Sequence, residues 1–217
     1  MKQYPHIQYY PKGIMGEPVY AFDKLDGSCM RAEWSKKRGW CKFGSRTQMI
    51  DENNQQFGMA IKLFKVQYAD DLDQIFRKKE EYRNSQEFVV YFEYFGDKSF
   101  AGYHVEGDKM FVRLFDVDQY KRGIIPAREF VDNFSHLLIP KIIYIGNLNH
   151  DFIQRVKDNE FGLKEGVVCK GVRKTKGKDL IWMVKIKTAD WLKRLKSLGD
   201  DKVALELAGE AKDEILA

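Results

Sequence analysis

The stretch Asp23-Lys24-Leu25-Asp26-Gly27-Ser28 contains a Lys-x-Asp-Gly signature, which follows a proline-rich entry and precedes an alternating stretch. On its own the tetrapeptide describes an ordinary charged turn, because Asp-Gly is favoured in hairpins and glycine tolerates positive φ. The other interpretation makes Lys24 a nucleophile. An amine at neutral pH is almost wholly protonated, so this use requires neighbouring cations or burial that lower its pKa. The later segments of the chain distinguish the two interpretations.

The chain of 217 residues has 44% hydrophobic and 14% aromatic residues and a net charge of +5. This length and composition predict a folded soluble protein with a substantial core, most simply one catalytic domain. The modest positive charge permits a polyanionic partner without requiring one. Two basic clusters, Lys36-Lys37-Arg38 and residues 173–178, are expected in a hairpin turn and a loop. There they either follow a phosphate backbone or simply keep a turn soluble.

The three cysteines, Cys29, Cys41 and Cys169, lie far apart and form no Cys-x-x-Cys pair, so they indicate neither a zinc site nor redox chemistry. A reducing, intracellular setting fits this pattern. The apolar runs are far shorter than the ~20 residues that span a bilayer, and residues 1–4 do not begin a signal peptide. We therefore expect a cytoplasmic monomer without a membrane partner.

Short strands separated by turn residues dominate the chain, which predicts antiparallel sheets. Strands are expected at 19–22, 29–34, 40–43, 88–95, 110–117, 142–145, 166–171 and 180–187. Apolar periodicity predicts helices from Asp70 or Asp71 to Tyr82, from Pro126 to Leu138 and from Asn149 to Lys157, and leans helical in the ambiguous segment 57–68. After Lys187 it predicts two short helices, around 191–198 and 203–208. The expected fold class is α+β, with helices packed outside antiparallel sheets.

Further segments carry charged or aromatic residues in a definite order. They are Phe43-Gly44-Ser45-Arg46-Thr47, Phe92-Glu93-Tyr94-Phe95-Gly96, Leu114-Phe115-Asp116-Val117, Glu165-Gly166-Val167-Val168-Cys169-Lys170 and Met183-Val184-Lys185-Ile186-Lys187. With the Lys24 stretch, these segments resemble the motifs of the covalent nucleotidyltransferases, the superfamily of ATP-dependent DNA ligases, RNA ligases and mRNA capping enzymes. The resemblance covers about residues 20–188. It implies a nucleotidyltransferase (adenylation) domain over 1–188, with 189–217 as a short helical extension of that domain.

Lys185 and Lys187 lie two residues apart on a predicted strand, so their side chains project from the same face. If Lys24 faces them, like-charge repulsion lowers the pKa of Lys24. The same two cations would bind phosphate oxygens and stabilise charge on the transferred group. The alternative is a strand edge with two exposed lysines. The resemblance implies catalytic roles for all three.

Glu93 and Glu165 lie within or just before hydrophobic strands, where unpaired carboxylates are costly. Such carboxylates suit a hard divalent cation and ribose hydroxyls, or else a salt bridge to a nearby lysine. The resemblance implies that Glu93 contacts ribose, that Glu165 lies near the metal and that Asp26 holds metal-bound water. The expected metal residues are Asp26, Glu93 and Glu165, with Mg²⁺ as the ion and Mn²⁺ as an alternative.

Phe115 lies in an apolar run typical of a core strand, but the resemblance implies that an aromatic ring at this position stacks on the purine. Arg46 resembles the arginine that contacts ribose or the incoming phosphate. The expected ATP-binding residues are Asp23, Arg46, Glu93, Phe115, Glu165, Lys185 and Lys187.

Within the superfamily, DNA ligases and capping enzymes commonly carry an arginine two positions after the motif glycine, where this chain has Cys29. Lys-x-Asp-Gly-Ser and the pair Arg46-Thr47 look more like phage-type RNA ligases. The thirty residues after Lys187 are too few for the oligonucleotide-binding barrel of DNA ligases and capping enzymes. The 23 residues before Lys24 are too few for the extra module of NAD-dependent ligases, so ATP is the expected donor.

The resemblance implies an ATP-dependent RNA ligase. Lys24 attacks the α-phosphorus of ATP to give lysyl-AMP and pyrophosphate, AMP passes to a 5′-phosphate end, and a 3′-hydroxyl displaces it. The expected partners are RNA, or DNA, with 5′-phosphate and 3′-hydroxyl ends. Two alternatives stay open: a minimal ATP-dependent DNA ligase, and a non-catalytic nucleic-acid-binding protein whose Lys24 belongs to a plain hairpin. The latter predicts strongly salt-dependent binding and no covalent nucleotide.

Overall fold

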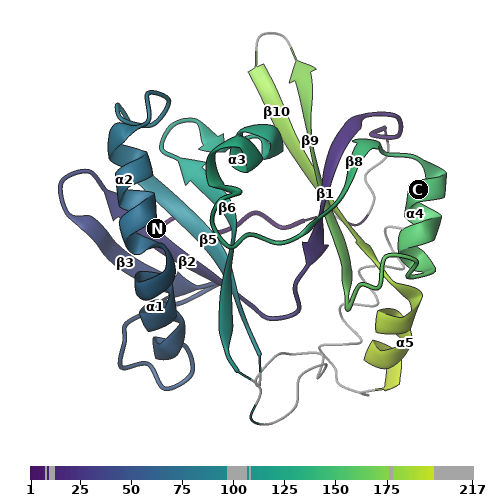
Figure 1. Ribbon diagram of the computed structural model, residues 1–217, viewed down its shortest axis with the longest axis horizontal. Coiled ribbons are helices and arrows are strands. Elements are labelled where there is room, and N and C mark those ends of the chain that lie inside the picture. Colours follow the sequence, from purple (N-terminus) through teal and green to yellow (C-terminus); the bar gives the residue numbers. More distant parts are fainter. Residues whose placement is uncertain (8, 10–12, 97–106, 108, 176–177, 198–217) are drawn as a thin grey trace. The chain divides into compact units, whose positions relative to one another are not determined.

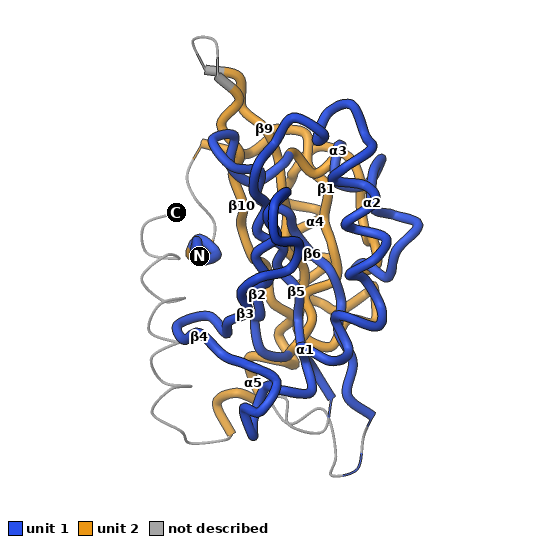
Figure 2. Tube along the Cα trace, turned by 90° about the vertical axis from the view of Figure 1, so that its left-hand side faces the viewer, with its two compact units in different colours: residues 1–5, 27–125, 129–139 blue, residues 6–26, 126–128, 140–217 orange. Residues whose placement is uncertain are grey.

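The computed structural model describes residues 1–7, 9, 13–96, 107, 109–175 and 178–197. Its Cα trace divides into two compact units, coloured separately in Figure 2. Unit 1 comprises residues 1–5, 27–125 and 129–139, and unit 2 comprises residues 6–26, 126–128 and 140–217. Each unit has its own antiparallel sheet.

Unit 1 is built on a six-stranded sheet in the order β4-β3-β2-β5-β6-β7 (Figure 1). The strands are β2 (Ser28–Ser35), β3 (Gly39–Ser45), β4 (Met49–Ile50), β5 (Glu87–Phe95), β6 (Phe111–Gln119) and β7 (Gly123–Ile124). All neighbouring strands pair antiparallel, as the short strands and turns predicted. The basic cluster at residues 36–38 lies in the turn between β2 and β3, which confirms its predicted place.

Helices cover one face of this sheet (Figure 1). They are α1 (Gly58–Phe64), the π-helix η1 (Lys65–Ala69), α2 (Asp70–Lys78) and α3 (Ala127–Phe134), of which residues 129–134 belong to unit 1. The segment 57–68, ambiguous in sequence, is therefore largely helical. It continues through η1 directly into α2.

Two predicted helices end earlier than their apolar periodicity suggested. The backbone of Lys79 is extended, so α2 ends at Lys78, although Tyr82 beyond it is fully buried. The Tyr82 ring packs against Phe88 and Phe134 and its hydroxyl accepts a hydrogen bond from Asn133, so the apolar pattern continues beyond the end of the helix. Similarly, α3 ends at Phe134, and the Leu138 carbonyl beyond it accepts hydrogen bonds from the Leu114 N–H of β6 and from the Tyr68 hydroxyl.

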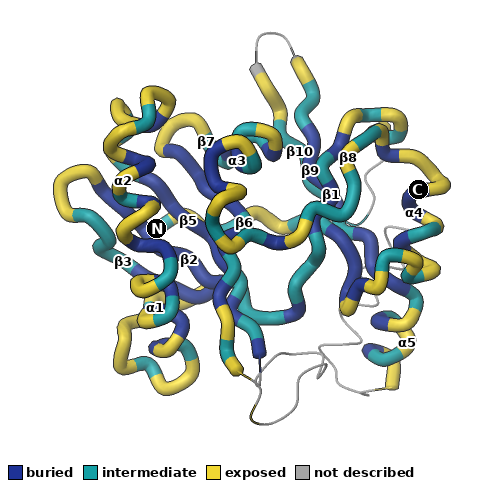
Figure 3. The backbone as a smooth tube through the Cα atoms, viewed as in Figure 1, coloured by how far each residue is buried: buried dark blue, intermediate teal, exposed yellow. Residues whose placement is uncertain are grey.

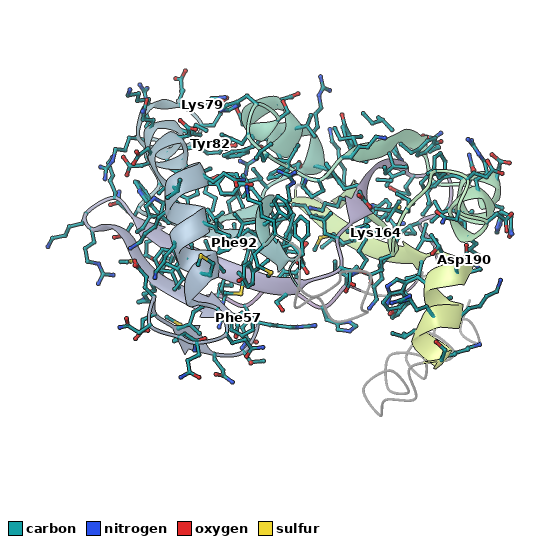
Figure 4. The ribbon with its side chains drawn as sticks, turned by 60° about the horizontal axis from the view of Figure 1, so that its bottom comes forward. Phe57, Lys79, Tyr82, Phe92, Lys164 and Asp190 are labelled. Atoms are coloured by element: carbon teal, nitrogen blue, oxygen red, sulfur yellow. The ribbon has the colours of Figure 1, made fainter. Side chains whose placement is uncertain are left out.

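The core of unit 1 is an aromatic layer between the sheet and these helices, and Figure 3 colours much of β2 and β5 as buried. Phe76 and Phe88 stack with ring centroids 4.0 Å apart, and Phe64 and Phe92 stack at 4.7 Å. Figure 4 labels Phe92 in this layer, together with Lys79 and Tyr82 after α2. Burying one such ring contributes roughly 1.5–3 kcal/mol relative to leaving it exposed.

Unit 2 is built on a four-stranded sheet in the order β10-β9-β1-β8. Its strands are β1 (Pro18–Lys24), β8 (Ile142–Asn147), β9 (Gly166–Thr175) and β10 (Lys178–Lys187), and its helices are α4 (His150–Lys157) and α5 (Ala189–Ser197). The Asn149 side chain caps α4 by accepting a hydrogen bond from the Phe152 N–H at 2.7 Å. Apolar residues of α4 pack on one face of the sheet, against a cluster that includes Val19, Ala21, Val167, Cys169, Val184 and Ile186.

The predicted loop over residues 173–178 is wrong for its described part. β9 continues to Thr175 and β10 begins at Lys178, because these two residues still pair in register. Arg173 is held against Glu17 at 2.9 Å. Of the two helices expected after Lys187, the first is α5, and the second lies outside the described residues. Within the described ranges, no helix has the length and apolar character needed to cross a bilayer.

Candidate functional site

The sheet of unit 2 has a lysine-rich face opposite the α4-covered core. Because residues paired across antiparallel strands share a face, Lys24 and Lys187 lie on the same side, since both pair with Gly166. The alternation of side chains adds Lys185, two residues from Lys187, and Lys170, four residues from Gly166. The structure therefore places the lysines of three predicted segments on one face.

Glu165 lies between two of these lysines. Its Oε1 is 2.7 Å from Lys24 Nζ and 3.3 Å from Lys187 Nζ. Glu165 and Lys187 are only 3% and 5% exposed, so these charges are largely removed from water. Buried charges persist when they are paired, since each offsets the desolvation of the other. The salt-bridge alternative for Glu165 is therefore seen here, whereas a metal role for it stays a prediction.

Gly166 makes room for this arrangement. An added Cβ would lie 2.1 Å from the Ile186 carbonyl oxygen, and the residue has φ +155°. A side chain at Gly166 would push β9 away from β10 at the point where Lys24 and Lys187 flank this residue. The glycine after Glu165 thus fixes how closely β9 approaches β10.

The other predicted carboxylates of unit 2 lie near the end of β1. Burial, followed by the charge of Glu165, raises the pKa of Asp23 above its ordinary value, although Lys141 and Lys164 oppose this. Figure 4 labels Lys164 immediately before β9. Asp26 is 7% exposed and follows β1. Its predicted role at a metal-bound water stays untested.

Two aromatic rings contact Lys185 and Lys187, and neither contact was predicted from the sequence. Lys185 Nζ lies 3.7 Å from the centroid of the Tyr9 ring, and Lys187 Nζ lies 3.5 Å from the centroid of the Trp191 ring. Cations at these distances are attracted by the ring face. For Trp191 a signal was available, because it follows the lysine segment by four residues at the start of a predicted helix.

Unit 1 contains Arg46, Glu93 and Phe115. Glu93 of β5 pairs with Cys29 of β2 and Arg113 of β6, on the face of the sheet opposite the aromatic core. Arg46 is exposed in the turn after β3. Burial raises the pKa of the Cys29 thiol to about 12, with Glu93 adding to the effect and Arg46 opposing it. The Cys29 thiol is therefore neutral at physiological pH.

Phe115 does not belong to the aromatic core, contrary to the core interpretation of its apolar run. The pairing of β5 and β6 shifts there, since Tyr91 faces Asp116 while Phe92 faces Leu114. Phe115 is the extra residue of this bulge, and bulges re-aim side chains. Its ring meets the Tyr4 ring edge-on at 5.0 Å and stacks at 6.4 Å on Tyr91.

The donor set can be compared with what a nucleotide and its metal require. Within the described ranges, no three His, Cys, Asp or Glu side chains gather into a metal-binding group. Mg²⁺ in phosphoryl-transfer sites is typically held by one or two carboxylates, with phosphates and waters as its other ligands. The buried carboxylates of Glu165 and Asp26 are of this hard-oxygen type, and the lysine face suits a triphosphate. The residues present therefore fit both groups.

No family model and no curated protein matches the chain. Solved structures do match. An archaeal ATP-dependent RNA ligase aligns with a TM-score of 0.59 and 17% identity, over 90% of this chain and 51% of that one. The Naegleria gruberi RNA ligase with PPi gives 0.57 and 18%, over 84% and 53%. A variant of the Naegleria enzyme with ATP and Mn gives 0.56 and 17%, over 83% and 52%.

These matches show that the chain has the fold of ATP-dependent RNA ligases, which confirms the predicted α+β nucleotidyltransferase fold. The chain spans about half the length of the ligases that it matches.

Proposed function

We propose that this chain carries the adenylation chemistry of an ATP-dependent RNA ligase, with Lys24 as the residue that becomes lysyl-AMP. The observation that carries the proposal is the buried cluster in unit 2, where Glu165 bridges Lys24 and Lys187. Structural likeness to ATP-dependent RNA ligases supports the reaction class. The motif order along residues 20–188 supports it independently.

In the proposed reaction, Lys24 Nζ forms a bond to the α-phosphorus of ATP while the bond from that phosphorus to the pyrophosphate oxygen breaks. Lys24 must first lose its proton, which passes to water because its side chain is 23% exposed. Glu165 Oε1, at 2.7 Å, accepts a hydrogen bond from Nζ and orients it, while the charge of Lys187 opposes a second ammonium nearby. Lys185 and Lys187 then bind phosphate oxygens as charge develops on the leaving group.

The remaining assignments follow the resemblance. Arg46, Glu93 and Phe115 are proposed as the nucleotide-binding residues of unit 1, and Asp23 as one of unit 2. A divalent ion, Mg²⁺ or Mn²⁺, would neutralise phosphate charge, with Asp26 and Glu165 of unit 2 as its proposed carboxylate ligands, and the metal role of Glu93 in unit 1 stays a prediction. We propose residues 1–188 as the adenylation domain with 189–217 as its extension. The substrate ends are a 5′-phosphate and a 3′-hydroxyl.

The first test is covalent labelling. Protein freed of nucleotide is incubated with Mg²⁺ and ATP labelled at the α- or the γ-phosphate, then denatured and separated. Label is expected from α-labelled ATP alone, and Lys24→Ala should abolish it. Lys193→Ala is the matched control. Lys193 is an exposed lysine of α5 that forms an ion pair with Asp190 at 3.6 Å, so this variant should be labelled to the same extent as the wild type. Absence of label in the wild type contradicts the proposal.

The second test separates RNA from DNA joining. Matched nicked RNA and DNA duplexes with 5′-phosphate and 3′-hydroxyl ends are offered to the adenylated protein. We expect RNA to be sealed faster. Faster sealing of DNA would favour the minimal DNA ligase, whereas adduct formation with neither substrate sealed would restrict the activity of this chain to the first step.

A further inference from the structure

Lys187 is held by an aromatic ring as well as by a carboxylate. Its Nζ lies 3.5 Å from the centroid of the Trp191 ring, and both residues are buried, at 5% and 3% exposure. Cation–π attraction is strongest for tryptophan and for desolvated cations. Both conditions hold here.

The indole N–H does not explain why tryptophan occupies this position. Trp191 Nε1 is buried and has no hydrogen-bond partner among the described residues. A buried donor without a partner costs stability, so another feature of the Trp191 side chain must offset the cost of its unused indole N–H. The feature of the side chain that is used is its ring face, which contacts Lys187.

The backbone fixes the ring relative to Glu165. Thr188, fully buried, donates its backbone N–H to the Glu165 carbonyl at 2.9 Å, and its Oγ1 accepts a hydrogen bond from the backbone N–H of Trp191 at 3.1 Å. Thr188 therefore caps the N-terminus of α5, which starts at Ala189, and connects its first turn to Glu165, the residue before β9. Figure 4 labels Asp190 in this first turn. The carboxylate, the ammonium and the ring thus belong to one hydrogen-bonded corner of unit 2.

We propose that Trp191 is a positioning residue for nucleotidyl transfer, its ring holding the Lys187 ammonium beside Glu165. The inference rests on the function proposed above. Glu165 Oε1 is shared by Lys24 and Lys187, so its pairing changes when Lys24 loses a proton and bonds to phosphorus. The ring face offers Lys187 a partner that takes no part in proton transfer. The ring thereby keeps the flexible Lys187 side chain in place during a step that changes the pairing of Glu165.

Two substitutions separate a ring from mere bulk. Trp191→Phe keeps an aromatic face, and Trp191→Leu keeps only apolar volume. Trp182→Leu is the matched control, because Trp182 is a second tryptophan of unit 2 with a buried Nε1 that has no partner, and it packs over Gly171. At saturating ATP, the single-turnover labelling rate should fall about tenfold in Trp191→Leu and by about threefold or less in Trp191→Phe. Trp182→Leu should stay within about twofold of wild type at temperatures where it is folded.

A readout independent of activity is tryptophan fluorescence. Lys187→Met should shift the emission of the wild-type protein, because it removes a cation from the indole face, and should not shift it in the Trp191→Phe background. Equal labelling rates in Trp191→Leu and wild type, or an emission shift that persists without Trp191, would overturn the inference. If the labelling rates of all three variants fall in proportion to their losses of melting temperature, Trp191 acts through packing alone. That result would also overturn the inference. If the wild type does not label, the proposed function fails, and the emission shift still tests the contact.

Discussion

At the scale of single residues, Glu165 sets the electrostatics of unit 2. Its carboxylate contacts two ammonium groups and also acts on Asp23, whose pKa is raised by burial first and by Glu165 second. The folded protein therefore holds the Asp23 proton more tightly than the unfolded chain does. Ionised Asp23 opposes folding at neutral pH, and this opposition disappears as the pH falls through the raised pKa to below 3.8.

Asp23→Asn removes this opposing charge. We expect a higher melting temperature than wild type at pH 7, a difference that narrows as the pH falls through the raised pKa of Asp23 and vanishes below about pH 3.8. Thermal unfolding of both proteins across this pH range measures it. A variant less stable than wild type at pH 7, or a difference independent of pH, would contradict the assignment.

The predictions for single residues succeeded where they depended on the alternation of side chains along a strand. They failed where they depended on contacts with segments that are distant in the sequence. The two-residue spacing of Lys185 and Lys187 was enough to place them on one face. The contact of Tyr9 with Lys185 arises because a segment distant in sequence returns to the strand, which no local pattern encodes. Phe115 was placed in an apolar run, but the bulge that moves it out of the core depends on the pairing with β5.

At the scale of elements, the approach of β9 to β10 depends on Gly166. Gly166→Ala would place a Cβ 2.1 Å from the Ile186 carbonyl, a clash with backbone that no rotamer relieves. We expect a lower melting temperature together with slower labelling from ATP, because Glu165 and Lys187 both adjoin this point. Gly162→Ala is the control, since φ is also positive there but nothing lies within 4 Å of the added Cβ. Its labelling rate should stay near wild type, and equal effects of the two variants would refute the role of close approach.

The π-helix η1 carries a second test at this scale. Tyr68, 1% exposed, has its hydroxyl 2.6 Å from the Leu138 carbonyl and 3.3 Å from the Leu114 N–H. Tyr68→Phe removes these hydrogen bonds, while the Leu114 N–H still donates to the Leu138 carbonyl at 3.3 Å, so it should cost about 0.5–1.5 kcal/mol of unfolding free energy. Urea unfolding measures the change. A loss below about 0.5 kcal/mol would show that the hydroxyl does not join these segments.

The same elements show why helix ends were predicted poorly. Tyr82 continues the apolar period because its ring is buried in the core although the helix has already ended, whereas the Leu138 side chain is 51% exposed and only its backbone carbonyl bonds to β6. Periodicity reports burial and says little about backbone hydrogen bonding. The strands, whose ends are fixed by turn residues, were placed more accurately.

At the scale of the whole chain, the order of short motifs predicted the fold although identity to the matching ligase structures is only 17–18%. This is reasonable, because the motif residues lie at strand ends and turns whose order follows from the topology. The division into two compact units was not expected from the sequence. Nor was the attachment of the proline-containing N-terminal segment to unit 1, where Lys2 pairs with Asp118 and Tyr4 bonds to Asp116.

The central claim is that Lys24 carries AMP. The most direct measurement is tandem mass spectrometry of a protease digest, made after nucleotide-free protein has reacted with ATP and Mg²⁺ and been denatured. We expect one adenylyl group on the side-chain nitrogen of Lys24. AMP on any other residue with Lys24 unmodified, or no adduct at all, would contradict it.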